Sequence, residues 1–125
     1  MKRDWDVIRE VLIEVEGMSF EQAVDFVYET PLKATNAAQA KAQQALLLQQ
    51  SGFLSGTTSN LLDGTRRLLQ PQLTWEGHEL LGTLRSKPVW ERIKATAQEK
   101  GIELTFDTVI TLGKAAVAWL IAQAS

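Results

Sequence analysis

The stretch Leu73–Leu81, which reads Leu-Thr-Trp-Glu-Gly-His-Glu-Leu-Leu, constrains the fold more than any other part of the chain. An apolar strand end meets a hydroxyl residue there, and Thr74 can cap a helix by accepting a hydrogen bond from an otherwise unsatisfied backbone N–H. Glu76 then falls in the first turn, where the helix dipole favours a negative charge. Leu80 and Leu81 begin an apolar face. We therefore expect a strand to pass into a helix at Thr74.

The residues before this transition, 53–74, predict a β-hairpin. Asp63-Gly64 is a tight-turn signal, and Pro71 suits an edge strand because proline cannot donate a ladder hydrogen bond. A strand that runs into Leu-Thr and a glycine-containing helix also occurs where the last wing strand of a winged-helix domain passes into its next helix. A short helical turn over residues 61–69 is an alternative that stays open.

Two helices are predicted before residue 31. The first begins with Asp4 as its N-cap and ends at Gly17 in the left-handed conformation. The second begins with a capping box over Ser19–Gln22, in which the serine bonds forward and the glutamine reaches back. We expect this second helix to bury Val27 and to stop before Pro31, since the residue before a proline is pushed out of the α region.

A third helix is predicted from a cap at Thr35 or Asn36 to about Gln50, ended by Gly52. In a helix-turn-helix protein this would be the recognition helix, and glutamine can pair with adenine in the major groove. The alternative is that alanine and glutamine are simply good formers of an exposed helix surface. The outward residues would include Gln39, Lys41, Gln43 and Gln44.

The C-terminal part predicts a helical pair. Pro88 suits the start of one helix, and Thr105 caps the other. The run from Ala115 to Ala122 is apolar all round, which an outer helix of a small monomer should not be. It is too short for a membrane span, which needs about 20 apolar residues. We expect burial on the helix's own domain and on a partner or a second copy, through Gly113, Val117, Trp119, Leu120 and Ile121.

The residues that could carry chemistry are few. His78 is the single histidine, and it is compatible with a general base or a metal ligand. The commoner case is a structural histidine that supports the helix start. There is no cysteine and no glycine-rich phosphate loop. We therefore expect no enzyme activity, no metal and no cofactor. The four tryptophans are interpreted as core anchors.

Composition bounds the class of protein. With 125 residues the chain is expected to form one globular unit. Its net charge of −2 argues mildly against non-specific binding to nucleic acid, which depends on excess lysine and arginine. Acidic residues from Asp4 onward interrupt any signal-peptide core, so the expected location is the cytoplasm, the host cytoplasm for a phage protein.

The opening Met-Lys-Arg-Asp-Trp-Asp-Val-Ile-Arg, the helix end Leu47-Leu48-Gln49-Gln50-Ser51-Gly52-Phe53-Leu54 and the Leu-Thr-Trp-Glu-Gly-His-Glu block together resemble a domain-of-unknown-function family of phages and bacteria. The resemblance covers the first two-thirds of the chain, with a weaker match at Val89-Trp90. It implies no established activity. Family members often carry Tyr-His where Gln43-Gln44 stand here, which implies that this chain can read a different partner.

The expected fold is mainly α with a small β-wing. It is a winged helix-turn-helix over residues 1–85 with an added C-terminal helical pair, 86–125, packed on it. The first functional hypothesis is a DNA-binding, regulatory protein of a phage or mobile element, with Arg66 and Arg67 of the wing against phosphates and a dimer through the last helix. An ordinary charged loop is the simpler explanation of the two arginines.

The second hypothesis is a protein-binding module on the same fold, such as a phage-encoded inhibitor of a host factor or host defence complex, like an anti-CRISPR protein. Fold analogy alone is a weak argument for either. The two differ in their surfaces. A DNA-binding protein should gather its basic residues on the face of the third helix and the wing. A protein-binding module should expose an apolar or acidic patch instead.

Overall fold

The computed structural model describes residues 2–30 and 37–124, and the chain divides into two compact units, 1–78 and 79–125. The division falls inside helix α4 (Trp75–Arg85), whose first turn belongs to the first unit. The expected boundary at residue 85 and the expected packing of the C-terminal helices on the first unit stay predictions.

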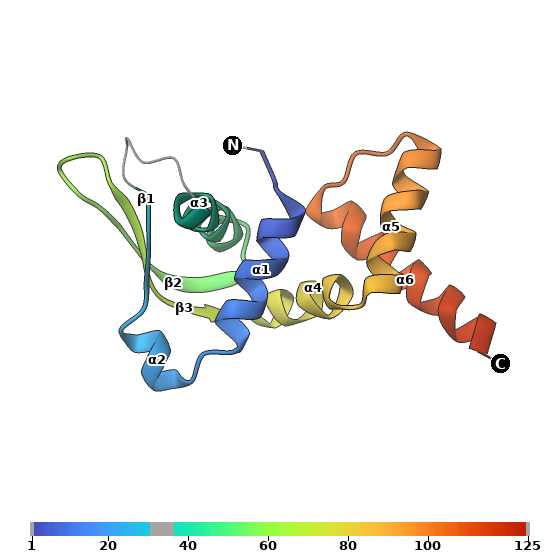
Figure 1. The fold of residues 1–125 in the computed structure, drawn as a ribbon, viewed down its shortest axis with the longest axis horizontal. Coiled ribbons are helices and arrows are strands. Elements are labelled where there is room, and N and C mark those ends of the chain that lie inside the picture. Colours follow the sequence, from blue (N-terminus) through green and yellow to red (C-terminus); the bar gives the residue numbers. More distant parts are fainter. Residues whose placement is uncertain (1, 31–36, 125) are drawn as a thin grey trace. The chain divides into compact units, whose positions relative to one another are not determined.

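The first unit contains a three-stranded antiparallel sheet (Figure 1). Its strands are β1 (Val27–Thr30), β2 (Leu54–Asn60) and β3 (Arg66–Leu73), in the order β1-β3-β2. The predicted hairpin is confirmed as β2 and β3, so the alternative of a helical turn over 61–69 is wrong. The fold is mainly α with a small β-wing, in a winged-helix-like arrangement.

Strand β1 was not expected from the sequence. Helix α2 (Phe20–Val24) has the predicted capping box but lasts for little more than one turn. Val27, expected to be buried on that helix, is instead an exposed residue of β1, where Tyr28 and Thr30 alternate inward. Pairing with β3 overrides the helical pattern here, because it gives the backbone of this short segment its hydrogen bonds.

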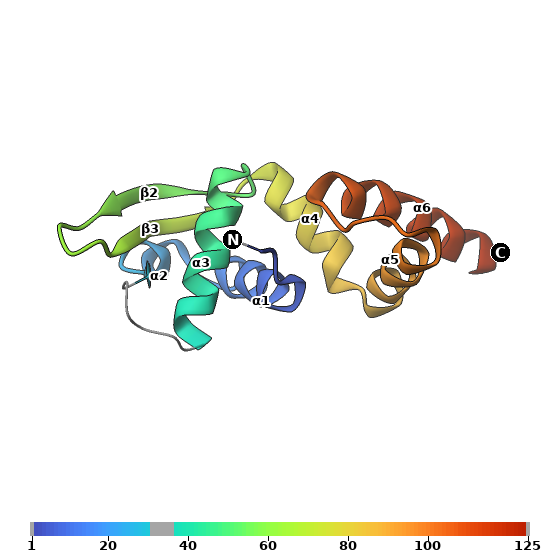
Figure 2. The same cartoon turned by 90° about the horizontal axis from the view of Figure 1, so that it is seen from above.

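Helix α3 (Ala37–Gln50) contacts all three strands, and α1 (Trp5–Glu16) packs against α3 and β3 (Figure 2). This arrangement forms the core of the first unit. Ala38, expected on the inner face of α3, is exposed. The largest fully buried side chains of this core come from both helices and the hairpin, namely Ile8, Leu12, Leu46, Leu48, Leu54 and Leu68.

The helix ends follow most of the predicted signals. The Asp4 carboxylate accepts from the Val7 N–H at 3.3 Å, as expected of an N-cap. Gly52 and Gly101 end their helices with positive φ, whereas Gly17 keeps right-handed backbone angles, so the left-handed end predicted for the first helix is wrong. The predicted cap at residue 35 or 36 and the stop at residue 31 lie outside the described residues.

Pro71 lies on β3, the central strand, so its placement on an edge strand is wrong. The chain tolerates it because β1 pairs with β3 only as far as Leu69. The pairing with β2 is interrupted nearby by a bulge between Ser55 and Thr57. A Cβ on Gly56 in that bulge would lie 2.8 Å from the Leu69 carbonyl oxygen, which explains the glycine.

The second unit consists of the rest of α4, α5 (Lys87–Lys100) and α6 (Phe106–Ala124). Ser86 caps α5, and the helical spacing of Val89, Trp90, Ile93 and Ala97 in the sequence predicts the inner stripe, all four being buried. The Thr105 hydroxyl caps α6 by accepting from the Thr108 N–H at 3.1 Å. Among the residues described, no helix is long and apolar enough to cross a membrane.

Candidate partner-binding surface

Gln44 does not face outward on α3, so its expected position on a DNA-reading face is wrong. Its side chain is 5% exposed. The amide oxygen accepts from the Asp4 N–H at 3.2 Å, and the amide nitrogen donates to the Lys2 carbonyl at 3.0 Å. Both halves of the amide are therefore engaged in fastening the N-terminal segment to α3.

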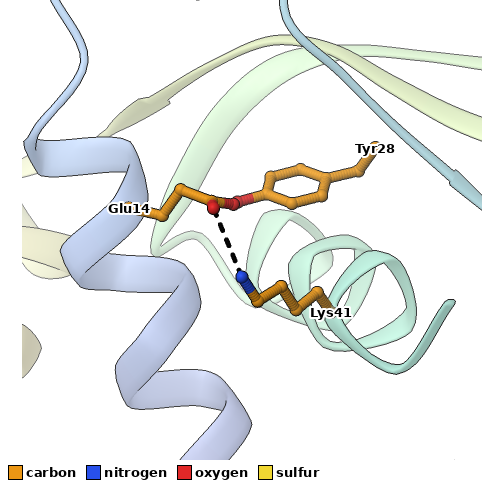
Figure 3. Close-up of polar contacts among 3 residues, drawn as sticks. All are labelled: Glu14, Tyr28 and Lys41. Atoms are coloured by element: carbon orange, nitrogen blue, oxygen red, sulfur yellow. Dashed lines mark hydrogen bonds and ion pairs between the residues drawn. The ribbon is translucent and has the colours of Figure 1, made fainter. Parts of the chain in front are cut away.

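Lys41 belongs to a polar cluster where α1, β1 and α3 meet (Figure 3). The Tyr28 hydroxyl donates to one Glu14 oxygen at 2.5 Å, and the Lys41 ammonium lies 3.3 Å from the other. Burial, together with the hydrogen bond and charge of Glu14, raises the pKa of the Tyr28 hydroxyl far above its ordinary value. The Lys41 charge is thus engaged inside the fold, although its side chain is about one-third exposed.

Gln39 and Gln43 are half-buried, so they offer partial surface and no charge. Together with the engaged Lys41 and the buried Gln44, they leave α3 without an outward basic residue in the described part of the helix. Phosphate contacts supply much of the affinity of DNA-binding proteins, and they come mainly from lysine and arginine. The face of α3 does not have that character.

The two arginines that were expected to contact phosphates differ in exposure. Arg66 is exposed, whereas Arg67 is half-buried with its guanidinium 3.8 Å from Glu29 on the neighbouring strand. The tip carries Leu61 and the fully exposed Leu62. No pattern in the sequence marks these two leucines as exposed, and they give the wing an apolar end.

An open hollow of about 250 Å³ lies where the end of α1, helix α2, the end of β3 and the first turn of α4 meet. Val15 and Ala23 are buried in its lining, while Phe20 and His78 are exposed at its rim. Six of its ten residues are apolar. The lining comprises Val15, Glu16, Met18, Ser19, Phe20, Ala23, Pro71, Gln72, Leu73 and His78.

The Leu-Thr-Trp-Glu-Gly-His-Glu block builds one side of this hollow. The Thr74 hydroxyl accepts from the Gly77 N–H at 3.1 Å and donates to the Gly52 carbonyl at 2.6 Å, so the predicted cap is confirmed. A Cβ on Gly77 would collide with the Phe53 carbonyl, and the glycine lets α4 start directly against that backbone. His78 is exposed and belongs to the lining of the hollow, whereas Thr74 supplies the helix start.

Two aromatic residues of the first unit are strongly exposed: Phe20 is 73% exposed and Trp75 is 75% exposed. Phe20 lines the hollow. Trp75 lies three residues before His78 in α4, and residues at this spacing are neighbours on a helix surface. The interpretation of Trp75 as a core anchor is wrong.

A signal in the sequence could have identified both exposed aromatics. Each directly follows a hydroxyl N-cap and precedes a glutamate, as Ser19-Phe20-Glu21 and Thr74-Trp75-Glu76. The first residue of a helix lies before the turn whose side chains pack against the core. An aromatic residue there gains little burial from its own helix.

The C-terminal half of α6 exposes an apolar face. Val117, Trp119 and Ile121 are 43%, 41% and 66% exposed, and Leu120 is half-buried. The Arg92 guanidinium lies 4.2 Å from the centre of the Trp119 ring, a cation–π distance. Gly113, expected at the same partner interface, is instead buried against Thr83 of its own unit, so that expectation is wrong.

Comparison with known proteins identifies the family of this chain. A model for the family described as hypothetical protein (DUF2513) matches residues 2–103. The chain belongs to this family. It is also similar to an uncharacterized protein of Haemophilus influenzae (strain ATCC 51907 / DSM 11121 / KW20 / Rd), with 28% identity over 122 residues that cover 98% of this chain and 100% of the relative. No solved structure matches the chain significantly.

In residues 2–30 and 37–124, no group of three histidine or carboxylate side chains is placed to hold a metal ion. The surface around Phe20, Trp75 and the hollow is the candidate functional site.

Proposed function

We propose that this chain is a non-enzymatic winged-helix protein that acts by binding another protein. The observation that carries the proposal is the strong exposure of two aromatic side chains of the first unit: Phe20, which lines the hollow, and Trp75, which lies one helical turn before the lining residue His78. Tryptophan and other aromatic residues are enriched in protein interfaces. A host factor, as expected for a phage-encoded inhibitor, is one class of partner within this proposal.

The magnitudes are sufficient for specific recognition. An aromatic side chain removes roughly 150–250 Å² from water when it is buried. At about 25 cal/mol per Å², each of the two rings would contribute several kcal/mol before the costs of association. Exposed apolar residues away from a binding surface usually occur singly, whereas here Phe20 lines the hollow and Trp75 lies one helical turn from its lining residue His78.

A second candidate, double-stranded DNA, is favoured by the hairpin. Arg66 is exposed next to the tip of the wing, and wing residues contact phosphates in winged-helix complexes. Against it stands helix α3, where Lys41 is paired with Glu14 and Gln44 is buried. The proposal also includes self-association, in which a second copy of the chain binds the apolar face of α6.

The test places a photo-crosslinking amino acid, benzoylphenylalanine, at position 20 or 75 in the full-length chain and irradiates cells of the organism that encodes it. Thr58, exposed on β2, is the control position. We expect the same partner to be crosslinked from both aromatic positions and not from the control. Absence of a crosslink at both, with salt-sensitive binding to duplex DNA that Arg66→Ala abolishes, would favour the second candidate.

A further inference from the structure

We infer that the tip of the β2–β3 hairpin is a preformed anchor, which inserts Leu62 into an apolar socket on a partner protein. This inference goes beyond the surface around Phe20 and Trp75, because it concerns another part of the first unit and does not depend on those two residues. Three features carry it: the exposure of the tip, the hydrogen bonds that fix its backbone, and the charges around it.

The hairpin tip presents two apolar side chains to solvent. Leu62 is fully exposed, and its neighbour Leu61 is 40% exposed. In both views the hairpin extends beyond the helices of the first unit (Figure 1, Figure 2). A single exposed leucine needs no explanation. The turn signals here, however, are Asp63 and Gly64, and a polar residue at position 62 would serve the turn equally well. The apolar pair is therefore a property of the surface and not a requirement of the turn.

Three hydrogen bonds fix the backbone of the tip. The Leu61 N–H donates to the Thr65 carbonyl at 2.8 Å, and the Gly64 N–H donates to the Leu61 carbonyl at 3.0 Å. The Asp63 carboxylate accepts from the Thr65 N–H at 2.9 Å. A loop that already holds its bound shape loses less conformational entropy on binding. The tip thus offers Leu62 in a preorganised position.

The charge at the tip argues against a lipid surface as the partner. Hydrogen bonds from Thr65 hold the pKa of Asp63 below its ordinary value, so this carboxylate stays ionised at neutral pH. Insertion of Leu62 among lipid chains would carry the neighbouring charge toward the hydrocarbon, which is costly. A protein socket can take the leucine and leave the carboxylate hydrated at its polar rim.

The cations of the hairpin argue against nucleic acid. Residues 54–73 contain two, Arg66 and Arg67, and the Arg67 guanidinium lies beside Glu29. Duplex binding draws much of its affinity from several phosphate contacts made by lysine and arginine. One exposed arginine and an apolar apex suit a protein better.

The experiment places benzoylphenylalanine at Asn60, an exposed strand residue beside the tip, in the full-length chain with Leu62 unchanged. Cells of the organism that encodes the chain are irradiated, and the captured protein is identified by mass spectrometry. The same chain is also made with Leu62→Ser, Leu62→Met or Ile13→Ser. Ile13→Ser is the matched control, since it removes another exposed apolar side chain of the first unit. Labelled duplex DNA and vesicles of phosphatidylethanolamine and phosphatidylglycerol are titrated in parallel.

We expect Leu62→Ser to lower the yield of one captured protein at least fivefold, and Leu62→Met and Ile13→Ser to leave it within twofold. Full burial of a leucine is worth roughly tenfold or more in affinity, and the flexible methionine side chain adapts to apolar gaps. The captured protein, once purified, should bind the native chain at least fivefold more tightly than the Leu62→Ser variant. Thermal melts of these two chains should coincide, because Leu62 is fully exposed.

A second pair of variants tests the fixed turn. Asp63→Asn keeps an oxygen that can accept from the Thr65 N–H, so capture should persist. Asp63→Ala removes this acceptor and should lower the yield at least twofold, although Leu62 is unchanged. Equal yields from both variants would show that the turn need not be preorganised and would overturn this part of the inference.

The inference is overturned if capture is unchanged in Leu62→Ser, or if it is no stronger from Asn60 than from Gln98, an exposed residue of α5. Binding to the duplex or the vesicles that depends on Leu62 would overturn it as well. Crosslinks from positions 20 and 75 judge the proposed function separately, because they report on another surface in a chain that retains Leu62.

Discussion

Gln44 shows how a residue in an apparently open helix position can be structural. Its amide bonds the Lys2 carbonyl and the Asp4 N–H, two backbone groups that have no helical or strand partner of their own. Gln44→Ala removes the hydrogen-bond partner of both backbone groups and should lower the free energy of unfolding by about 1–3 kcal/mol. Urea denaturation measures this. The neighbouring half-exposed Gln43→Ala should change it by less than about 0.5 kcal/mol, and equal losses would contradict the tether.

Tyr28 predicts a stability loss at alkaline pH. Its folded pKa lies above the unfolded value of 10.0 because of burial and of Glu14. Above pH 10 the unfolded chain releases the phenolic proton while the folded chain retains it, so stability is full below pH 10 and falls as the pH rises above it. Denaturant titrations from pH 8 to 11 should show this fall, and Tyr28→Phe should make it shallower. An unchanged slope in the variant would show that other groups cause it.

Gly77 and Gly82 form a matched pair in one helix. A methyl group on Gly77 would collide with the Phe53 carbonyl, whereas one on exposed Gly82 meets nothing within 4 Å. Gly82→Ala should therefore stabilise the protein by about 0.5–1 kcal/mol through helix propensity. Gly77→Ala should destabilise it by about 1–3 kcal/mol. The melting temperatures of the two variants test this. A shift in the same direction for both would contradict the close approach of Gly77 to the Phe53 carbonyl.

At the scale of elements, α6 combines a packed half with an exposed apolar half. Ile121, at 66% exposure, is the most open of its large side chains. If a second copy covers this face, the sedimentation coefficient should rise with concentration, and Ile121→Lys should hold the chain monomeric by placing a charge in the interface. Gln98→Lys, at an exposed position of α5, is the control. If the sedimentation coefficient of the native chain is that of a monomer at every concentration, α6 is not a self-association surface.

The elements differ in how far the sequence determines them. Those specified by local signals could be predicted: the cap at Asp4, the hairpin turn at Asp63-Gly64, the helix start at Thr74 and the inner stripe of α5. Strand β1 could not, because a four-residue segment gains its identity from pairing with β3, a partner about 40 residues away. Local propensity has no access to such a partner.

The candidate site was only partly predictable for the same reason. The block around Thr74 was recognised as a helix start, but the exposure of Trp75 depends on what the rest of the chain leaves uncovered. The sequence did not show that Gln44 is buried and that Lys41 is paired, because residues 2–4 and α1 reach these side chains of α3 from a distance in sequence. Helical periodicity identifies the two faces of a helix, and it cannot tell which polar side chains will find internal partners.

At the scale of the whole molecule, charge and apolar exposure are unevenly distributed along the chain. Residues 10–30 hold six of the fifteen acidic residues and no lysine or arginine, while six of the thirteen lysines and arginines come after residue 84. A net charge of −2 conceals this separation. Composition alone therefore argued weakly against nucleic acid and gave no indication of where a charged partner would bind. The fold brings two segments that are distant in sequence, around residues 15–23 and 71–78, to one hollow.

The sheet edge formed by β2 has a consequence for the behaviour of the protein at high concentration. Its outer side offers unpaired backbone groups to any other strand, which is a common route to fibrils. The bulge at Gly56 bends this edge, and serine, threonine and asparagine residues cover it. A bent, hydroxyl-rich ribbon is a poor template for stacking. The edge at β2 is therefore poorly suited to pairing with further copies of the chain, even though two large aromatic rings lie exposed elsewhere on the first unit.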